Sequence, residues 1–432
     1  MPPSTERTSA GEAAAQAPPQ APPEPHALLE HLLAGIQREL HRAVALRRRL
    51  HALPELAHAE ERTAASIEAE LPVPCQPAAG TGRLALIGED GPAGAGGHAV
   101  AGGHAVAVRA ELDALPVREL TGAPFAARGE AMHACGHDVH MAALVALARA
   151  AHELRAALPA PLLAVFQPSE EAYPSGAQQL ADGPLATLAP AAVVAAHVHP
   201  ELPWGTVALD PGVVNASCDA FAITLEGEPS HGAYPHRGRD PILAIAEIVV
   251  ALHAQVGRRV DPLHPASLTV GALEGGSAEN VIPPLARARG ALRAHRQQDR
   301  LALRVLVEEV VQGVAAAHDC RASVELVPGE PALKNDPELV ARARVLLAHA
   351  GFTGAAEWRS VGSDDFAFFG ALAPLAMAFV GLNGADGFTA RPLHHPELLP
   401  PDEAVGAVAR AQAALYLAAA CTPAQARLAL GK

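Results

Sequence analysis

Three apolar segments in the first half of this chain each end in side chains that could bind a metal. The segments with these side chains are 104–112 with Asp113, 161–166 with Glu170 and Glu171, and 191–198 with His197. Short apolar runs bounded by turn residues are typical of buried strands. In open α/β sheets, functional residues collect beyond the carboxyl ends of such strands. The repeated placement therefore predicts an α/β fold with a metal site across the ends of its sheet.

Residues 132–140 read MHACGHDVH and lie between the first two of these segments. Imidazole and thiolate are side chains that bind zinc and similar divalent metals. Cys135 and His137 are two residues apart, so one loop could aim both at a single point. The alternatives are a His-rich surface loop, a buried structural thiol, or a cysteine nucleophile activated by a histidine. The last two would leave the acidic pair and His197 without a role, and we therefore favour metal binding.

The adjacent carboxylates Glu170 and Glu171 would, taken alone, more often be a solvated acidic turn, because charged pairs are usually exposed. At the end of a strand, adjacent side chains point in different directions. One carboxylate could then bind metal while the other faces the substrate.

Composition excludes several classes of protein. The net charge of −14 argues against nucleic acid as a partner, because phosphate binding needs a basic face. The five cysteines are an odd number without close pairs, which favours a reducing compartment over a disulfide framework. No apolar run approaches the roughly 18 residues of a membrane span, and the start of the chain does not read as a signal peptide. We therefore expect a cytoplasmic protein that does not bind membranes.

The length of 432 residues predicts two domains. Residues 1–25 are rich in Pro, Ala, Glu and Gln, which predicts a disordered extension. Residues 212–327 show a strand, a helix, two strands and a helix, as expected for a small α+β insertion with a sheet on one side. Residues 26–211 and 328–432 would then form the two parts of a catalytic domain.

Nine motifs in this sequence resemble, in the same order, those of a known enzyme family. They are LHALPEL (50–56), RAELDALP (109–116), MHACGHDVH (132–140), FQPSEE (166–171), HVHPELPWG (197–205), SHGAYPH (230–236), GGSAENVIP (275–283), VGSDDF (361–366) and LHHPE (393–397). The resemblance is to the metal-dependent amidohydrolase branch of the aminoacylase and carboxypeptidase metallopeptidase family. That branch contains hippurate hydrolases, N-acyl-amino-acid amidohydrolases and auxin-conjugate hydrolases. The resemblance covers nearly everything beyond residue 26.

This resemblance implies a zinc-exopeptidase-like catalytic domain with helices on both faces of a mixed sheet. It also implies an inserted α+β lid that usually forms a homodimer. Two divalent metal ions are implied, with zinc favoured by thiolate and imidazole, and manganese, cobalt or nickel possible. The implied ligands are Cys135, which would bridge the metals, with His137, Glu171, His197 and His394. His395 is adjacent to His394, and only the motif position favours His394, since spacing cannot decide.

The resemblance also implies roles for five further residues. Glu170 would be the general base, and Asp113 would orient a ligand. His231 would reach a substrate oxygen in the partner subunit's site, or else be a turn histidine. Asn280 would bind the substrate's carboxylate, unless it only caps the turn before the following proline. Arg293 would bind the same carboxylate.

The sequence departs from the family pattern at several positions. Glu111 stands where Asp is more usual, Ala172-Tyr173-Pro174-Ser175 where glycines are usual, and His199 where an aromatic residue is common. Because of these departures, the resemblance does not identify the substrate. The residues around Arg293 also differ from the family pattern. We expect His199, His236 and His295 to be polar surface residues rather than ligands.

The expected activity is hydrolysis of the amide bond of N-acyl amino acids or similar small amides. Two metals about 3.5–4 Å apart would activate a water, and Glu170 would take its proton. One alternative is a dipeptidase or carboxypeptidase with the same chemistry. The other is a binding protein without catalysis, which the retention of Glu170 and all five ligands disfavours.

Overall fold

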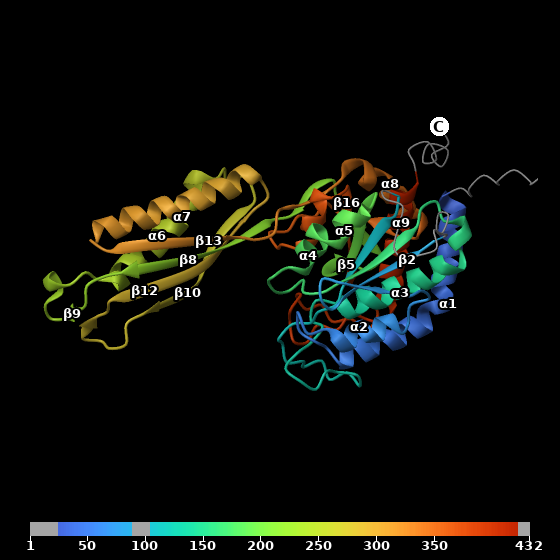
Figure 1. Ribbon diagram of the computed structural model, residues 1–432, viewed down its shortest axis with the longest axis horizontal. Coiled ribbons are helices and arrows are strands. Elements are labelled where there is room, and N and C mark those ends of the chain that lie inside the picture. Colours follow the sequence, from blue (N-terminus) through green and yellow to red (C-terminus); the bar gives the residue numbers. More distant parts are fainter. Residues whose placement is uncertain (1–24, 89–103, 422–432) are drawn as a thin grey trace, which may run out of the picture.

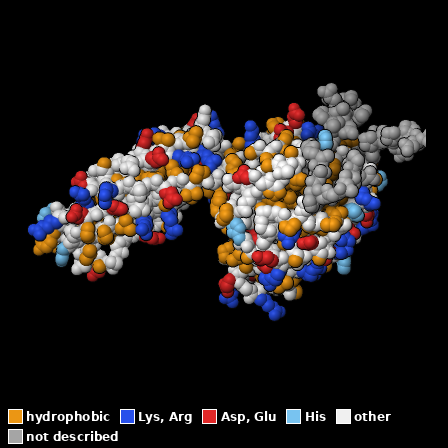
Figure 2. Space-filling view, viewed as in Figure 1, with side chains coloured by type: hydrophobic (Ala, Val, Ile, Leu, Met, Phe, Trp, Pro, Cys, Tyr) orange, Lys and Arg blue, Asp and Glu red, His pale blue; other side chains and the backbone are white. Residues whose placement is uncertain are grey.

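The computed structural model describes residues 25–88 and 104–421, which form a larger catalytic lobe and a smaller lid joined at a narrow waist (Figure 1). The disordered extension predicted for residues 1–25 lies, except for Pro25, outside the described residues. On the face drawn in Figure 2, acidic and basic side chains are interspersed over both lobes.

The catalytic lobe is built on a mixed sheet of eight strands in the order β1-β2-β4-β3-β5-β16-β6-β15. The strands are β1 (Gln76–Ala78), β2 (Gly82–Ile87), β3 (Val106–Glu111), β4 (Leu162–Gln167), β5 (Ala192–Pro203), β6 (Thr206–Ala208), β15 (Thr353–Gly354) and β16 (Leu375–Asn383). The four neighbours β4, β3, β5 and β16 run parallel to one another. Their carboxyl ends therefore meet at one edge, as the sequence pattern requires.

Helices cover both faces of this sheet (Figure 1). One face packs against α1 (Pro25–Ala52), α2 (Glu61–Glu68), α3 (His137–Glu153), α8 (Pro337–His349) and α9 (Glu403–Ala420). The other face packs against α4 (Gly176–Asp182), α5 (Pro184–Leu188) and the 3-10 helix η3 (Asp365–Ala371). Successive residues of β3 explain the two cores, because Val106 and Val108 face the first and Ala107 faces the second. The predicted fold class is confirmed.

The lid is an antiparallel sheet in the order β10-β12-β8-β13, with two long helices packed against it. Its strands are β8 (Ser217–Glu226), β10 (Ala266–Gly275), β12 (Leu285–Ala294) and β13 (Arg321–Pro328), and its helices are α6 (Pro241–Arg259) and α7 (Gln297–Ala317). The sequence pattern predicted only three strands here. It missed β13, a half-exposed edge strand whose polar residues alternate with apolar ones.

Short elements join and extend the two lobes. They are β7 (Gly212–Asn215), which pairs with β14 (Leu333–Asn335), β9 (Ser230–His231), which pairs with β11 (Val281–Ile282), and the 3-10 turns η1 (Arg155–Ala157) and η2 (Pro235–Arg237). The lid sheet itself runs from Ser217 to Pro328. The predicted lid limits of 212 and 327 stay a prediction.

Among the described residues, α6 alone is long and apolar enough to cross a membrane by length and composition. One side of this helix, with Ala244, Ile245, Ile248 and Leu252, is buried against the lid sheet. The buried side therefore has a structural use within the lid, whereas Leu243 and Val250 are exposed.

Candidate metal centre

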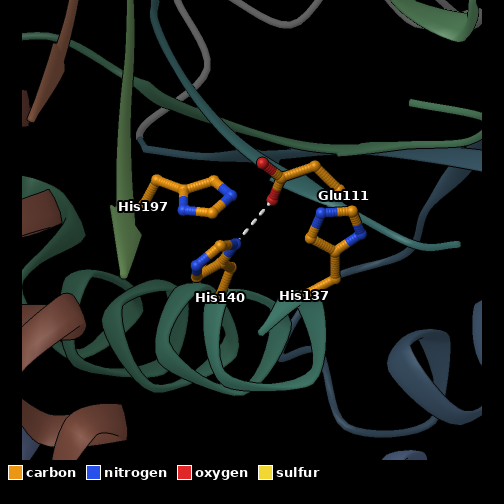
Figure 3. Close-up of side chains that lie close together, drawn as sticks. All are labelled: Glu111, His137, His140 and His197. Atoms are coloured by element: carbon orange, nitrogen blue, oxygen red, sulfur yellow. Dashed lines mark hydrogen bonds and ion pairs between the residues drawn. The ribbon is translucent and has the colours of Figure 1, made fainter. Parts of the chain in front are cut away.

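Most of the predicted ligands meet where the parallel strands end. Ligand atoms of Cys135, Glu171 and His394 lie within 4.8 Å of one another, and so do those of His137, Glu170 and Glu171. A third group contains His137 and His197 together with Glu111 and His140 (Figure 3). Shared members link the three groups into one cluster, in which Glu170 and Glu171 are half-buried and His394 is exposed.

The loop before α3 places its two ligands on either side of a left-handed glycine turn. Gly136 has a φ of +86°, and a Cβ on this residue would lie 2.5 Å from a methyl group of Val198. Only glycine fits such a close approach in the left-handed region. The helix begins at His137, directly after this turn. Cys135 Sγ lies 3.5 Å from His197 Nε2.

Backbone carbonyls orient the two histidines that point into the cluster. His137 Nδ1 donates to the Asp113 carbonyl oxygen at 2.8 Å, and His197 Nδ1 donates to the Val198 carbonyl oxygen at 2.6 Å. Each Nε2 is thereby left as the free lone-pair donor, as in metal-binding histidines. His137 Nε2 is buried and has no hydrogen-bond partner in the described part of the chain.

His140 lies in the same cluster but has no lone pair to spare. Its Nε2 accepts from the Val198 backbone N–H at 3.0 Å, so the proton sits on Nδ1. Nδ1 in turn donates to Glu111 at 2.9 Å, the dashed line in Figure 3. The other oxygen of Glu111 accepts from Arg109. His140 and Glu111 therefore support the ligands. Sequence reasoning gave neither a role, although Glu111 was noted as a departure from the family.

The acidic turn after β4 is held in place by Asp113 and Glu60. Ser169 adopts a left-handed φ of 49°, and its N–H donates to Glu60 at 2.8 Å. The N–H of Glu171 donates to Asp113 Oδ2 at 2.9 Å. Asp113 thus fixes His137 through its carbonyl and the acidic turn through its carboxylate. This geometry suits the orienting role predicted for Asp113.

The fifth predicted ligand comes from a loop near the end of the chain. The N–H of His394 donates to the Ala134 carbonyl at 2.8 Å, and its Nε2 lies 3.2 Å from Glu171 Oε1. The adjacent His395 instead accepts from the Glu397 N–H through Nδ1 at 3.1 Å. The structure thus places His394, and not His395, beside Cys135 and Glu171.

The electrostatics of the cluster suit a cation. Burial, and then the carboxylates of Glu171 and Glu170, raise the pKa of the Cys135 thiol well above its ordinary value. Burial and the nearby Glu171 likewise raise the pKa of Glu170, whereas burial and His140 lower the pKa of His197 and keep its imidazole neutral. Divalent cations would compensate the converging carboxylates and stabilise the thiolate. The residues present therefore fit the two metal ions that the sequence implied.

A buried network next to Glu170 was missed by sequence reasoning. Arg109 is 1% exposed and binds Asp364 at 3.2 Å and Asp365 at 3.0 Å. Gln167 Nε2 also donates to Asp365 at 2.7 Å. Burial, moderated by Arg109, raises the pKa of Asp365 to about 7. The signal was present in the RAELDALP and VGSDDF motifs, but only folding shows that they meet.

A second missed network lies behind the metal loop. Asp138, in the first turn of α3, binds Arg47 Nε at 2.7 Å and His51 Nδ1 at 2.9 Å. The second ring nitrogen of His51 lies 3.2 Å from Glu119. Burial opposes protonation of His51, but the two carboxylates outweigh it and raise the pKa of this imidazole to about 9. The network ties α1 to the helix that begins at His137.

The predicted residues of the lid do not lie at this cluster within one chain. β9, with His231, is at the end of the lid remote from the catalytic lobe (Figure 1). Asn280 is beside it, since its carbonyl accepts from the Gly232 N–H at 2.7 Å. Arg293 lies instead at the waist, where Nη1 donates to the Val361 carbonyl at 3.2 Å and to Ser363 Oγ at 3.3 Å.

The expectation of a polar surface position was wrong for His295. This residue is buried at the waist and bonds to the Ser360 carbonyl through Nε2 at 2.7 Å. The segment with Ser360, which is distant in the sequence, packs against His295 there. A local sequence pattern does not reveal this contact. His236 is exposed as expected, and His199 is half-buried.

Comparisons with known proteins agree with this geometry. The model of the family described as peptidase family M20/M25/M40 matches residues 107–417. N-acetyl-L-cysteine deacetylase of Bacillus subtilis (strain 168) is 34% identical over 369 residues, which is 84% of each chain. N-acetyldiaminopimelate deacetylase of Bacillus pumilus is 33% identical over 302 residues, 69% of this chain and 78% of the relative.

A solved structure supports the same assignment. The Bacillus subtilis YXEP protein, described as a dinuclear metal binding peptidase from the M20 family, is 28% identical with a TM-score of 0.74. The match covers 88% of this chain and 98% of that one. The resemblance stated from the motifs is confirmed. The chain belongs to peptidase family M20/M25/M40 and is a hydrolase of amide bonds.

Proposed function

We propose that this protein hydrolyses the amide bond of N-acyl amino acids or similar small amides. The observation behind this proposal is the buried, unpaired Nε2 of His137, which among the described residues has no hydrogen-bond partner. It lies 3.9 Å from Glu170 and 4.0 Å from Glu171. A lone pair and two carboxylates facing one another in a buried space are suited to divalent metal chemistry.

Two divalent metal ions would be held by Cys135, His137, Glu171, His197 and His394. When bound, such ions polarise a carbonyl and lower the pKa of a water. Thiolate and imidazole donors favour zinc, while manganese, cobalt and nickel also accept this ligand set.

Glu170 is the group that moves the proton. Its pKa is raised by burial and by Glu171, so it can hold a proton taken from the attacking water. It then delivers this proton to the nitrogen of the leaving amino acid. Asp113 holds the turn that carries Glu170, through its bond to the Glu171 N–H.

The substrate's carboxylate would bind Arg293 at the waist together with Asn280, and a substrate oxygen would bind His231. Asn280 and His231 would come from the lid of a second copy. Within one chain, Asn280 and His231 lie at the end of the lid remote from the metal cluster. They could therefore contact substrate only in the site of another copy, or in their own site after the lid closes. A homodimer formed through the lid and a cytoplasmic location are part of this proposal. The curated relatives named as deacetylases of N-acetylated amino acids support this substrate class.

The test is release of free amine from N-acetyl-, N-benzoyl- and indoleacetyl-amino acids, with simple dipeptides beside them. The protein is first loaded with zinc, manganese, cobalt or nickel. Chelator-sensitive hydrolysis of the acyl-amino acids supports the proposal, whereas cleavage of dipeptides alone would identify a peptidase. Absence of hydrolysis with every metal would reject it.

Substitution of Glu170 by glutamine separates catalysis from metal binding. Turnover should fall by at least about 100-fold, as expected for loss of a general base, while metal content stays at that of the wild type. The matched control is Glu61→Gln, an exposed glutamate on α2. Near-wild-type activity of the Glu170 variant would rule out the assigned role.

A further inference from the structure

Three aromatic side chains, which we call the aromatic strip, extend from the metal centre and have no role in the mechanism above. They are His199, Trp358 and Phe379. The ring of Phe379 lies 6.4 Å from that of the proposed ligand His197. Trp358 then packs on Phe379 with ring centroids 4.1 Å apart. His199 meets Trp358 edge-on at 5.0 Å, so the contacts are continuous.

The strand geometry explains why the strip begins at the metal centre. His197 and His199 are two apart on β5, so they project from the same face of the sheet. Phe379 is the residue opposite His197 on the parallel neighbour β16. Trp358 comes from the segment that leads to Asp364, beside the acidic cluster.

Exposure increases along the strip. Phe379 is only 5% exposed, whereas Trp358 and His199 are half-buried. The partial exposure beside a proposed ligand leaves ring surface free to contact a bound molecule.

The charged side chains on either side of Trp358 are paired with each other. Glu357 and Arg359, on either side of Trp358, bind each other at 2.9 Å. Arg359 also lies 3.8 Å from Asp210. The strip therefore offers the ring surfaces of Trp358 and His199, which suit an uncharged group.

We propose that Trp358 and His199 bind the acyl group of the substrate and favour aromatic or extended aliphatic acyl groups over acetyl. This inference rests on the proposed function and deepens it. The carboxylate of the amino acid is assigned to Arg293, whose guanidinium binds Ser363 at 3.3 Å. The acyl group is the remaining apolar part of such a substrate, and the strip is an apolar surface that starts at the metal centre.

The test compares kcat/KM for N-benzoylglycine and N-acetylglycine in the wild type and in Trp358→Ala. The ratio should fall by about ten-fold or more in the variant, because acetyl has no ring to lose contact with. Trp358→Phe should restore most of the ratio. Phe368→Ala is the matched control, since Phe368 is a half-buried ring on the same core, carried by η3. The ratio of the two kcat/KM values in Phe368→Ala should equal that of the wild type.

A second series varies the amino acid at constant acyl group, from glycine to phenylalanine. If Trp358→Ala changes this series and not the acyl series, the assignment to the acyl group is wrong. Hydrolysis with unchanged ratios in both series would also overturn the inference while leaving the proposed function intact.

Binding provides a readout that does not depend on turnover. In metal-loaded Glu170→Gln, calorimetry should show N-benzoylglycine bound about ten-fold more weakly once Trp358 is also replaced by alanine. If no acyl-amino acid is hydrolysed by the wild type, the proposed function fails, and this measurement still decides the inference. Equal affinities, or no binding in either variant, would reject it.

Discussion

Replacing His51 by asparagine should remove a pH-dependent part of the free energy of unfolding. His51 is fully buried, and its two ring nitrogens face Asp138 at 2.9 Å and Glu119 at 3.2 Å. These carboxylates raise the pKa of the imidazole from 6.5 to about 9 against the effect of burial. Asp138 keeps its bond to Arg47 at 2.7 Å, so the variant should still fold.

The magnitude follows from linkage between protonation and folding. Each pH unit between the unfolded and the folded pKa corresponds to about 1.4 kcal/mol, so protonation of His51 contributes roughly 3 kcal/mol. Because the folded pKa is the higher one, this stabilisation is fully present below pH 6.5. It is lost as pH rises from 6.5 through about 9.

The assay is urea unfolding of wild type and His51→Asn from pH 6 to pH 10, both saturated with the same metal. The difference in unfolding free energy should shrink by roughly 3 kcal/mol between the two ends of this range. His318→Asn is the control, because the ion pair of His318 with Glu247 is partly exposed and should contribute about 0–1 kcal/mol. A difference that stays constant with pH would mean that His51 is neutral in the folded protein, and would refute the reasoning.

Three further predictions concern folding and metal. Gly176→Ala should lower the free energy of unfolding by about 3 kcal/mol or more in urea titration, because the added Cβ would lie 1.7 Å from the Pro168 carbonyl oxygen. Arg109→Leu should lower it by about 3–5 kcal/mol, since Asp364 and Asp365 would lose their buried partner. Removal of metal with a chelator should lower it by about 3 kcal/mol if the metal was present at 100 times its Kd, and added metal should restore it.

The two substitutions have controls that the chain supplies. Gly257 lies within α6, and a Cβ on this residue would meet no described atom within 4 Å, so Gly257→Ala should not destabilise the protein. Arg38 forms an exposed ion pair with Glu153, and Arg38→Leu should cost less than about 1 kcal/mol. An unfolding curve unaffected by chelator would argue against metal at the cluster.

Local patterns were enough for the main elements of the fold. The apolar run of residues 161–166 is a property of neighbouring residues, and β4 (Leu162–Gln167) forms there. β13 was missed because an edge strand buries only one side, so its polar residues weaken the pattern.

The predicted metal ligands are close in space, although their roles stay a prediction. Cys135 and His137 share one motif, and the strand ends supply Glu171 and His197 through the geometry of parallel strands. His394 comes from a loop far along the chain, and its motif position was the only guide. The choice over His395 required the structure, because adjacent residues differ only in where the backbone points them.

The sequence by itself determined that thiolate, imidazole and carboxylate groups suited to metal binding lie at strand ends. Residue types and their positions along strands are local properties of the chain. Only the tertiary structure decided which polar groups are free. His140 shares the MHACGHDVH motif with His137, yet both of its nitrogens are used, by Val198 and by Glu111. Likewise, Arg109 and Asp365 are 256 residues apart and become partners only in the folded protein. Contacts between distant segments decide which nitrogen keeps a free lone pair, which group carries a proton and which charge is buried. No local pattern encodes those contacts.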